Sequence, residues 1–378
     1  MRLINVNTLQ LEEFPPDKIP RYAILSHTWG EEHEEVSFRD ITEGIVRKGD
    51  SRPSKLEKFC KRAAKDNLKY AWIDTCCIDK TDSAELEEAI SSMFKWYSSA
   101  AVCYAYLSDV TVKRAHRDFS SQISSCRWFK RGWTLQELLA PRMLRFYNSR
   151  WTFIGTKGQL SRMIEEIHGV PRPILQGTAS FKDYSIAQRM CWASKRETKR
   201  KEDVAYCLLG VFDVMIPIIY GEGDQAFARL QREIVKRGRS DSSIFAWGLE
   251  PASADSEENV SAGLFATSPA DFKGCGNITV PSYSLHWRAI SPRDDGFTGV
   301  NLGLLTFPTG DIFGILQCVF EVGDKEKVFG IPLSREEPDK YIRPQGCSLE
   351  VFPRSRENSR FYTSNKITLI RTERETIT

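Results

Sequence analysis

The chain has 378 residues, of which 41% are hydrophobic and 27% are charged, a composition typical of a soluble globular protein. Its formal net charge of +3 is small for this length, so the overall charge does not favour a nucleic-acid partner. A chain of this length exceeds one ordinary hydrophobic core, and we expect two or three domains.

The N-terminal segment MRLINVNTLQLEEF lacks the basic and apolar regions of a signal peptide. No apolar run approaches the length of a membrane span. The ten cysteines form no C-x-x-C pair and have no spacing typical of a zinc site, so we expect no metal and a reducing compartment. The sequence therefore predicts a cytoplasmic location.

Apolar runs and helical spacing alternate along the first half of the chain. After an extended arm over residues 1–19, strands are predicted over 22–26, 70–74, 101–107, 143–147 and 151–154. Helices are predicted over 54–68, from an N-cap at Asp82 with Glu85 three residues on, and as one helix over 127–140. This alternation predicts an α/β fold with a mostly parallel sheet flanked by helices.

The second half changes character twice. The pattern of residues 157–237 is mainly helical, and the composition of residues 250–262 is typical of a linker. Short alternating runs such as 302–307, 312–320 and 327–331 predict a β-rich C-terminal module. We therefore expect a first domain over 1–165, a helical extension over 166–249, the linker, and the β-rich module over 263–378.

One motif in the helical part resembles a dinucleotide-binding fingerprint. Gly221-Glu-Gly223-Asp-Gln-Ala226 fits G-x-G-x-x-A, but the run before it contains Pro217, which is unfavourable in a central strand. A loop leading into a helix N-terminus is the better interpretation.

Polar and aromatic residues cluster after the predicted strands or at the start of the next helix. Taken singly, each also fits a structural role, since His and Asp commonly bond to nearby backbone and Trp commonly packs in the core. Taken together, they could share the rim where open α/β sheets hold ligands. A rim with aromatic walls and a carboxylate suits a nucleotide or a sugar better than a metal ion or DNA. The residues are Ser26, His27, Trp29, Asp74, Asp79, Trp133 and Glu137.

Three blocks resemble the signature motifs of the fungal heterokaryon incompatibility (HET) domain: Ala23-Ile-Leu-Ser-His-Thr-Trp-Gly30, Trp72-Ile-Asp-Thr-Cys-Cys-Ile-Asp79 and Arg131-Gly-Trp-Thr-Leu-Gln-Glu137. The resemblance covers roughly residues 1–250. It implies a protein that triggers programmed cell death when genetically different fungal cells fuse. Many members of this family carry a nucleotide-binding switch module downstream, which implies an allelic or NLR-type regulatory partner. This chain ends at Thr378 without such a module, so the mode of regulation stays open.

The HET domain is itself distantly similar to the TIR domain, which implies a TIR-like sheet. Enzymatic TIR domains cleave NAD between nicotinamide and ribose, and the glutamate of their third motif is catalytic. By this similarity Glu137 is the catalytic residue, the rim residues bind substrate, NAD is a substrate rather than a cofactor, and activation involves a homo-oligomer. The chain departs from the TIR pattern at Thr134, where cysteine is usual, and at Arg131, where serine is usual.

Two functions therefore stay open at this point. One is a cell-death effector that hydrolyses NAD; the other is a non-enzymatic scaffold that self-associates and recruits partners. A third and weaker reading, nucleic-acid binding, predicts salt-sensitive binding that a net charge of +3 does not suggest.

Overall fold

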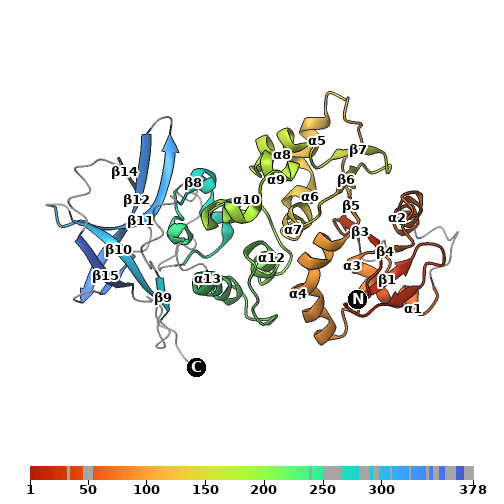
Figure 1. Cartoon of the computed structure of the whole chain (residues 1–378), viewed down its shortest axis with the longest axis horizontal. Helices are drawn as coiled ribbons and strands as arrows, with labels where there is room; N and C mark the ends of the chain where they lie inside the picture. Colours follow the sequence, from red (N-terminus) through yellow and green to blue (C-terminus); the bar gives the residue numbers. More distant parts are fainter. Residues whose placement is uncertain are drawn as a thin grey trace. The chain divides into compact units, whose positions relative to one another are not determined.

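The computed structural model describes residues 1–31, 35–45, 54–237, 241–249, 265–280, 290–292, 298–306, 309–322, 325–337, 340–343, 349–353 and 363–369 (Figure 1). The predicted linker over 250–262 lies outside these residues. The chain divides into two compact units. The first comprises Met1–Ser180 with Tyr206–Val211, and the second comprises Phe181–Ala205 with Phe212–Thr378.

The first unit is built on a seven-stranded sheet, with strand order β2-β1-β4-β3-β5-β6-β7 among the described residues. The four central strands run parallel, whereas β1, β2 and β7 pair antiparallel at the two edges. This confirms a mixed α/β fold whose sheet is parallel at its centre. The strands are β1 (Arg2–Asn5), β2 (Leu11–Glu13), β3 (Tyr22–His27), β4 (Tyr70–Trp72), β5 (Val102–Tyr106), β6 (Leu144–Tyr147) and β7 (Phe153–Thr156).

Strand β3 lies at the centre of this sheet, and all six of its residues are buried. Its register places Ser26 beside Ala105 and His27 beside Tyr106 of β5. Successive side chains of a strand point to opposite faces. Ser26 and His27 therefore present polar groups to opposite faces of the sheet at its carboxyl edge.

Helices cover both faces of the sheet, with α2 on one face and α4 and α7 on the other (Figure 1). Helix α4 has the predicted N-cap, because the Asp82 side chain accepts from the backbone N–H groups of Ala84 and Glu85. The Glu85 side chain does not complete a capping box and instead accepts from the Asp79 N–H at 2.9 Å. The helices of this unit up to residue 180 are α1 (Phe38–Thr42), α2 (Ser54–Lys65), α3 (Asp74–Cys77), α4 (Ser83–Ser99), α5 (Phe119–Ser125), α6 (Arg127–Lys130), α7 (Thr134–Leu139), α8 (Ser161–His168) and α9 (Arg172–Gln176).

Two sequence-based expectations for this unit were wrong. Residues 1–19 do not form an arm, because β1 adds to the edge of the sheet, with Ile4 opposite Ala71 of β4. The single helix expected over 127–140 is two short helices, α6 and α7, separated at Arg131, whose backbone is extended (φ −76°, ψ 134°). The first difference arises from pairing with a strand distant in sequence, and the second from side-chain hydrogen bonds. The spacing of apolar residues indicates neither.

The second unit joins helices to a second sheet. The Ser185 hydroxyl accepts from the Gln188 N–H at the start of α10 and donates to the Ile278 carbonyl at 2.6 Å, which fixes that helix to the following segment. The helices of this unit are α10 (Ile186–Ala193), α11 (Asp203–Tyr206) and α13 (Gln225–Arg237), with 3-10 turns at Phe181–Asp183, Ser242–Phe245, Pro269–Phe272 and Cys275–Asn277. Helix α12 (Leu209–Phe212) belongs to the first unit except for Phe212. Helix α12 and the end of α11 contain the points where the chain passes between the two units.

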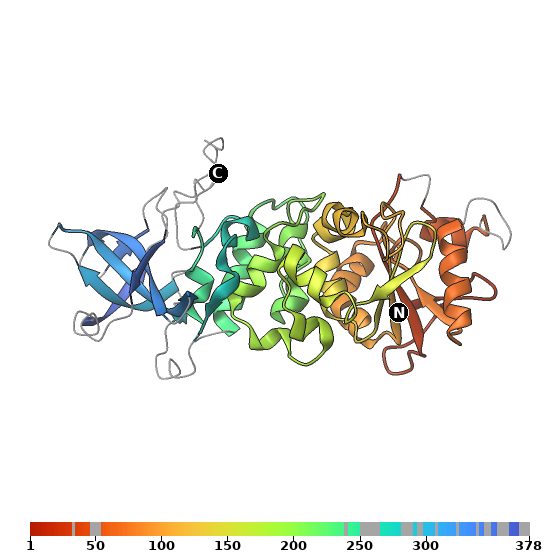
Figure 2. The same ribbon diagram turned by 90° about the horizontal axis from the view of Figure 1, so that it is seen from above.

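The β-rich character predicted for the C-terminal part is present in an eight-stranded sheet, in which seven strands follow the order β14-β12-β13-β15-β10-β11-β8 and the eighth, β9, pairs with β10. Strand β12 also pairs with β11, so five strands are paired in a closed circuit, and Figure 2 shows these strands, in blue, strongly curved. Ile315, Val319 and Val328 form an apolar cluster within it. The strands are β8 (Ile278–Thr279), β9 (Ile290–Pro292), β10 (Thr298–Thr306), β11 (Ile312–Val322), β12 (Lys325–Glu337), β13 (Lys340–Ile342), β14 (Glu350–Pro353) and β15 (Thr363–Leu369).

Within the described residues, no helix has both the length and the apolar character that crossing a bilayer requires.

Candidate functional site

Glu137 of α7 lies in the interior, only 6% exposed, against the end of β3. The Ser26 hydroxyl donates a hydrogen bond to Glu137 Oε2, and the Trp128 indole N–H donates to the Ser26 oxygen at 2.7 Å. Burial raises the pKa of the Glu137 carboxyl to about 7, against the opposing charge of Arg131 and the hydrogen bonds of Ser26 and Tyr97. This carboxyl therefore changes its protonation near neutral pH.

The break between α6 and α7 determines where Glu137 lies. The fully buried Thr134 hydroxyl contacts two carbonyl oxygens, those of Trp128 and of Arg131, the second at 2.9 Å. It thereby ties the first turn of α7 back to α6. At the other end of α7, the buried Lys157 ammonium donates to the carbonyls of Leu138 at 3.1 Å and Pro141 at 2.6 Å. Hydrogen bonds from side chains at both ends therefore fix the position of this short helix.

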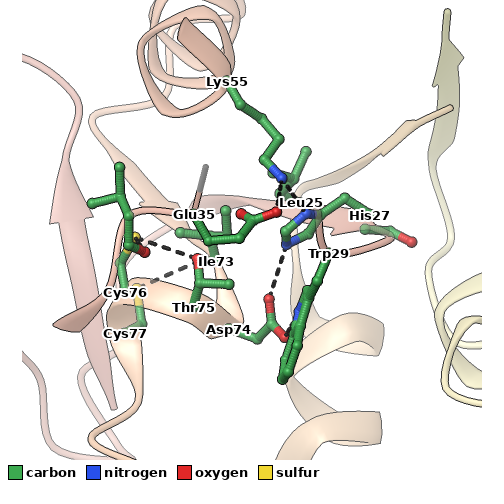
Figure 3. A network of polar contacts seen from close by, with 12 residues as sticks. Leu25, His27, Trp29, Glu35, Lys55, Ile73, Asp74, Thr75, Cys76 and Cys77 are labelled. Carbon is green, nitrogen blue, oxygen red and sulfur yellow. Dashed lines mark hydrogen bonds and ion pairs between the residues drawn. The ribbon is translucent and has the colours of Figure 1, made fainter. Parts of the chain in front are cut away.

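A second polar network lies at the same edge of the sheet, on the α2 side (Figure 3). His27 Nε2 lies 3.0 Å from Asp74 Oδ1, and the Trp29 indole N–H donates to Asp74 Oδ2 at 2.8 Å. The Lys55 ammonium lies 3.0 Å from His27 Nδ1 and also donates to Glu35 Oε1. The network thus runs from Glu35 through Lys55, His27 and Asp74 to Trp29.

The donors in this network fix the protonation of His27. An ammonium can only donate, so Nδ1 of His27 accepts from Lys55 and the ring proton sits on Nε2, directed at Asp74. Burial and the Lys55 charge lower the pKa of His27, consistent with a neutral ring. Burial disfavours the charged form of Asp74, but the bond from His27 and the nearby charges of Lys80 and Arg131 hold its pKa well below the usual range. Asp74 is therefore ionised.

Positive groups surround Trp29 at this edge. The Lys80 ammonium lies 3.8 Å from the centroid of the Trp29 ring, and the Arg131 guanidinium carbon lies 4.8 Å from it. Arg131 also donates to the His27 carbonyl at 3.4 Å. Since Arg131 lowers and Asp74 raises the pKa of Glu137, the Ser26 and His27 networks are electrostatically coupled.

Of the seven predicted site residues, five come together at this edge: Ser26, His27, Trp29, Asp74 and Glu137. Asp79 instead bonds within its own loop, where its carboxylate accepts from the Thr81 N–H at 2.9 Å and the Thr81 hydroxyl at 2.6 Å. Trp133 is half-buried immediately before α7.

Sequence reasoning missed three residues of the site: Lys55, Glu35 and Trp128. Trp128 is 0% exposed, and nothing in its sequence distinguishes it from a tryptophan that only packs in the core, although its N–H donates to Ser26. Lys55 and Glu35 lie in charged segments, where the sequence does not distinguish a partly buried ion pair from solvated charges. The side-chain exposure of this pair is only 19% and 10%, so the structure is what reveals it.

The Gly221–Ala226 motif has a structural use. Its Gly221 and Gly223 N–H groups donate to a single carboxylate oxygen of Glu202, at 2.8 and 3.1 Å. Among the described residues no strand lies between β7, which ends at Thr156, and this motif, and helix α13 begins at Gln225, as the alternative interpretation predicts. Glu202 thus occupies the amides that a phosphate would use in a dinucleotide fold.

In the part of the chain that the structure describes, no group of three or more His, Cys, Asp or Glu side chains is placed to hold a metal ion. The nine cysteines there are free thiols. Two of them adjoin Asp74: Cys76 donates to the Val36 carbonyl at 3.1 Å, and burial raises the pKa of Cys77 (Figure 3). These thiols are core groups rather than nucleophiles.

Residues 22–117 match the family model described as heterokaryon incompatibility protein (HET). The chain is also 46% identical over 235 residues to vegetative incompatibility protein HET-E-1 of Podospora anserina. That match covers 60% of this chain and 17% of the relative, so the chain spans about a sixth of its length. No solved structure matches the chain.

Proposed function

We propose that this chain, which carries a HET domain over residues 22–117, is a heterokaryon-incompatibility type cell-death effector that cleaves NAD to nicotinamide and ADP-ribose. One observation carries the proposal. Glu137, in a motif that resembles the catalytic motif of TIR domains, is a buried carboxyl with a pKa of about 7 at the carboxyl edge of parallel strands. Ligands bind at this edge in open α/β sheets, and strongly shifted groups there are functional candidates.

The proposed reaction breaks the bond between the nicotinamide nitrogen and the ribose C1′. The electron pair of this bond stays with the ring, so nicotinamide leaves as a neutral base and positive charge develops on the ribose. An ionised Glu137 stabilises that oxocarbenium-like charge, and water then adds at C1′ and releases one proton to the solvent to give ADP-ribose. Because the leaving group needs no proton, a single carboxylate is sufficient.

In this proposal Ser26 and Trp128 position the carboxylate. The Trp128 N–H directs the Ser26 hydroxyl, whose hydrogen then points to Glu137. A serine that donates stabilises the ionised form, which the reaction requires. Trp133, immediately before α7, and the His27–Asp74 pair then provide substrate contacts at the rim.

Glu137 is 6% exposed, so a ribose can reach it only if neighbouring side chains or loops move. This fits an enzyme whose activation requires assembly. We therefore include a homo-oligomer, and an allelic or NLR-type regulatory protein as its trigger, in the proposal. Binding energy from that assembly would offset the cost of opening the site.

The deciding experiment measures nicotinamide release from NAD by the purified chain at concentrations high enough for assembly. Wild type is expected to release nicotinamide and Glu137→Gln is not, while Glu88→Gln, the same change on an exposed residue of α4, keeps full activity. The rate should fall as the pH is lowered through about 7, because only ionised Glu137 is active. Equal rates from wild type and Glu137→Gln would refute the catalytic role.

A second candidate function is the non-enzymatic scaffold that self-associates to trigger cell death. The observation that favours it is the near-complete burial of Glu137 with a partner already in place, as expected for a structural carboxyl. Glu137→Ala in cells separates the two functions. Loss of toxicity with folding and assembly intact favours the enzyme, whereas retained toxicity favours the scaffold.

A further inference from the structure

The Lys80 side chain has a position that the two hydrogen-bond networks do not explain. It follows α3 in the chain, is exposed, and places its ammonium 3.8 Å from the centroid of the Trp29 ring. In the described part of the chain no carboxylate lies within 4.0 Å of this ammonium, the limit for an ion pair. A cation–π contact holds the side chain in place without neutralising its charge.

Arg131 adds a second cation against the same ring, with its guanidinium carbon 4.8 Å from the ring centroid. The Asp74 carboxylate beside them has both oxygens engaged, one with His27 and one with the Trp29 N–H. The Trp29 N–H is thus bonded to the Asp74 carboxylate, while the Lys80 and Arg131 side chains lie against the Trp29 ring. This arrangement presents positive charge at the rim rather than an aromatic face for stacking.

From these contacts we infer that Lys80 and Arg131, both held against Trp29, form the subsite for the pyrophosphate of a dinucleotide substrate. The inference rests on the proposed function, from which it takes the substrate class. A dinucleotide carries two negative charges on its pyrophosphate and develops positive charge at the ribose. The rim has the matching distribution, with cations at Trp29 and a titratable carboxylate at Glu137.

The test uses ADP-ribose, the product that keeps the pyrophosphate and has no nicotinamide. Lys80→Met is expected to weaken ADP-ribose binding by about tenfold, the loss of one charge-assisted contact. Lys80→Arg should keep most of the affinity. The matched control is Lys69→Met, because Lys69 is also an exposed lysine in a cation–π contact, with its ammonium 5.1 Å from the centroid of the Tyr70 ring. Lys69 immediately precedes β4, whereas Lys80 and the proposed subsite lie beyond the other end of that strand. Lys69→Met should bind ADP-ribose like wild type.

Salt dependence separates an ionic subsite from a purely structural role. Affinity for ADP-ribose should fall with added salt in wild type and fall less steeply in Lys80→Met. The inference would be overturned if Lys80→Met bound ADP-ribose as tightly as wild type, or if its affinity were lower than that of wild type by the same factor at every salt concentration. It would also be overturned if wild type did not bind ADP-ribose. Lys80-dependent binding without nicotinamide release would refute the hydrolase and leave the subsite standing. Nicotinamide release with the same KM for NAD in wild type and Lys80→Met would refute the subsite alone.

Discussion

Replacing Glu137 by glutamine should stabilise the folded chain above neutral pH while removing the proposed activity. The substitution keeps the shape of the side chain and an oxygen that can accept from Ser26, but it removes the ionisable proton. Because the folded state holds the Glu137 proton more tightly than the unfolded state does, ionisation costs stability. A residue retained for function at such a cost is a common feature of active sites.

The magnitude follows from the raised pKa of Glu137. Between the ordinary value of 4.5 and the folded value of about 7, the native state binds more protons than the unfolded state. The contribution of this proton to stability is therefore complete below pH 4.5 and is lost as the pH rises through 7. At about 1.4 kcal/mol per pKa unit, the loss amounts to roughly 3 kcal/mol. Glu137→Gln has no such loss, so its advantage over wild type should grow from near zero at pH 4 to about this value at pH 8.

Urea unfolding of the full chain, followed by tryptophan fluorescence at several pH values, measures this difference. Six of the nine tryptophans lie within Met1–Ser180, so the signal reports mainly on the unit that contains Glu137. Glu88→Gln serves as the control and should track wild type at every pH, since surface changes usually alter stability by less than about 0.5 kcal/mol. If Glu137→Gln were less stable than wild type at pH 8, the carboxylate would be a structural ion and the reasoning would fail.

Two further substitutions test the packing of the first unit. Thr134→Val should lower the free energy of unfolding by about 1–3 kcal/mol, because it removes the hydroxyl bonded to the Trp128 carbonyl; Thr134→Ser should keep that bond, and urea midpoints compare the two. Gly210→Ala should cost a similar about 1–3 kcal/mol, because its new Cβ would overlap the Phe94 ring, whereas Gly158→Ala meets no atom closer than 4.0 Å and should be nearly neutral in the same assay. Equal stability of Gly210→Ala and Gly158→Ala would show that Phe94 moves aside freely.

The strands that carry the site could be predicted because each is a short apolar run with a clear end. Strand β3 was expected over 22–26 and spans Tyr22–His27, and β5 was expected over 101–107 and spans Val102–Tyr106. Side chains that follow neighbouring parallel strands meet at one edge, which is why Ser26, His27 and Asp74 could be grouped before their contacts were known. These are local signals combined with one topological rule.

The remaining features depend on contacts between distant residues. Lys55 and His27 are far apart in the chain, and nothing in the α2 sequence indicates that this lysine contacts an imidazole. The break before α7 depends on where the Thr134 hydroxyl bonds, while the helical spacing across 127–140 is uninterrupted. The pairing of β1 with β4 likewise joins segments that the sequence pattern treats separately. The spacing of apolar residues indicates helices and strands, but it does not indicate which side-chain contacts hold them together.

The position of β3 also explains how two nearby carboxyl groups come to differ in protonation. Ser26 and His27 are adjacent in sequence but point to opposite faces of the sheet, so each organises its own network. On the α2 side, neutral His27 donates to Asp74 and keeps it ionised. On the α7 side, burial dominates and leaves Glu137 titrating near pH 7. Environments that separate the pKa values of two neighbouring acids assign them different roles. Asp74 is accordingly a fixed anion bonded to His27 and Trp29, whereas Glu137 changes its charge near neutral pH, as the proposed hydrolase requires.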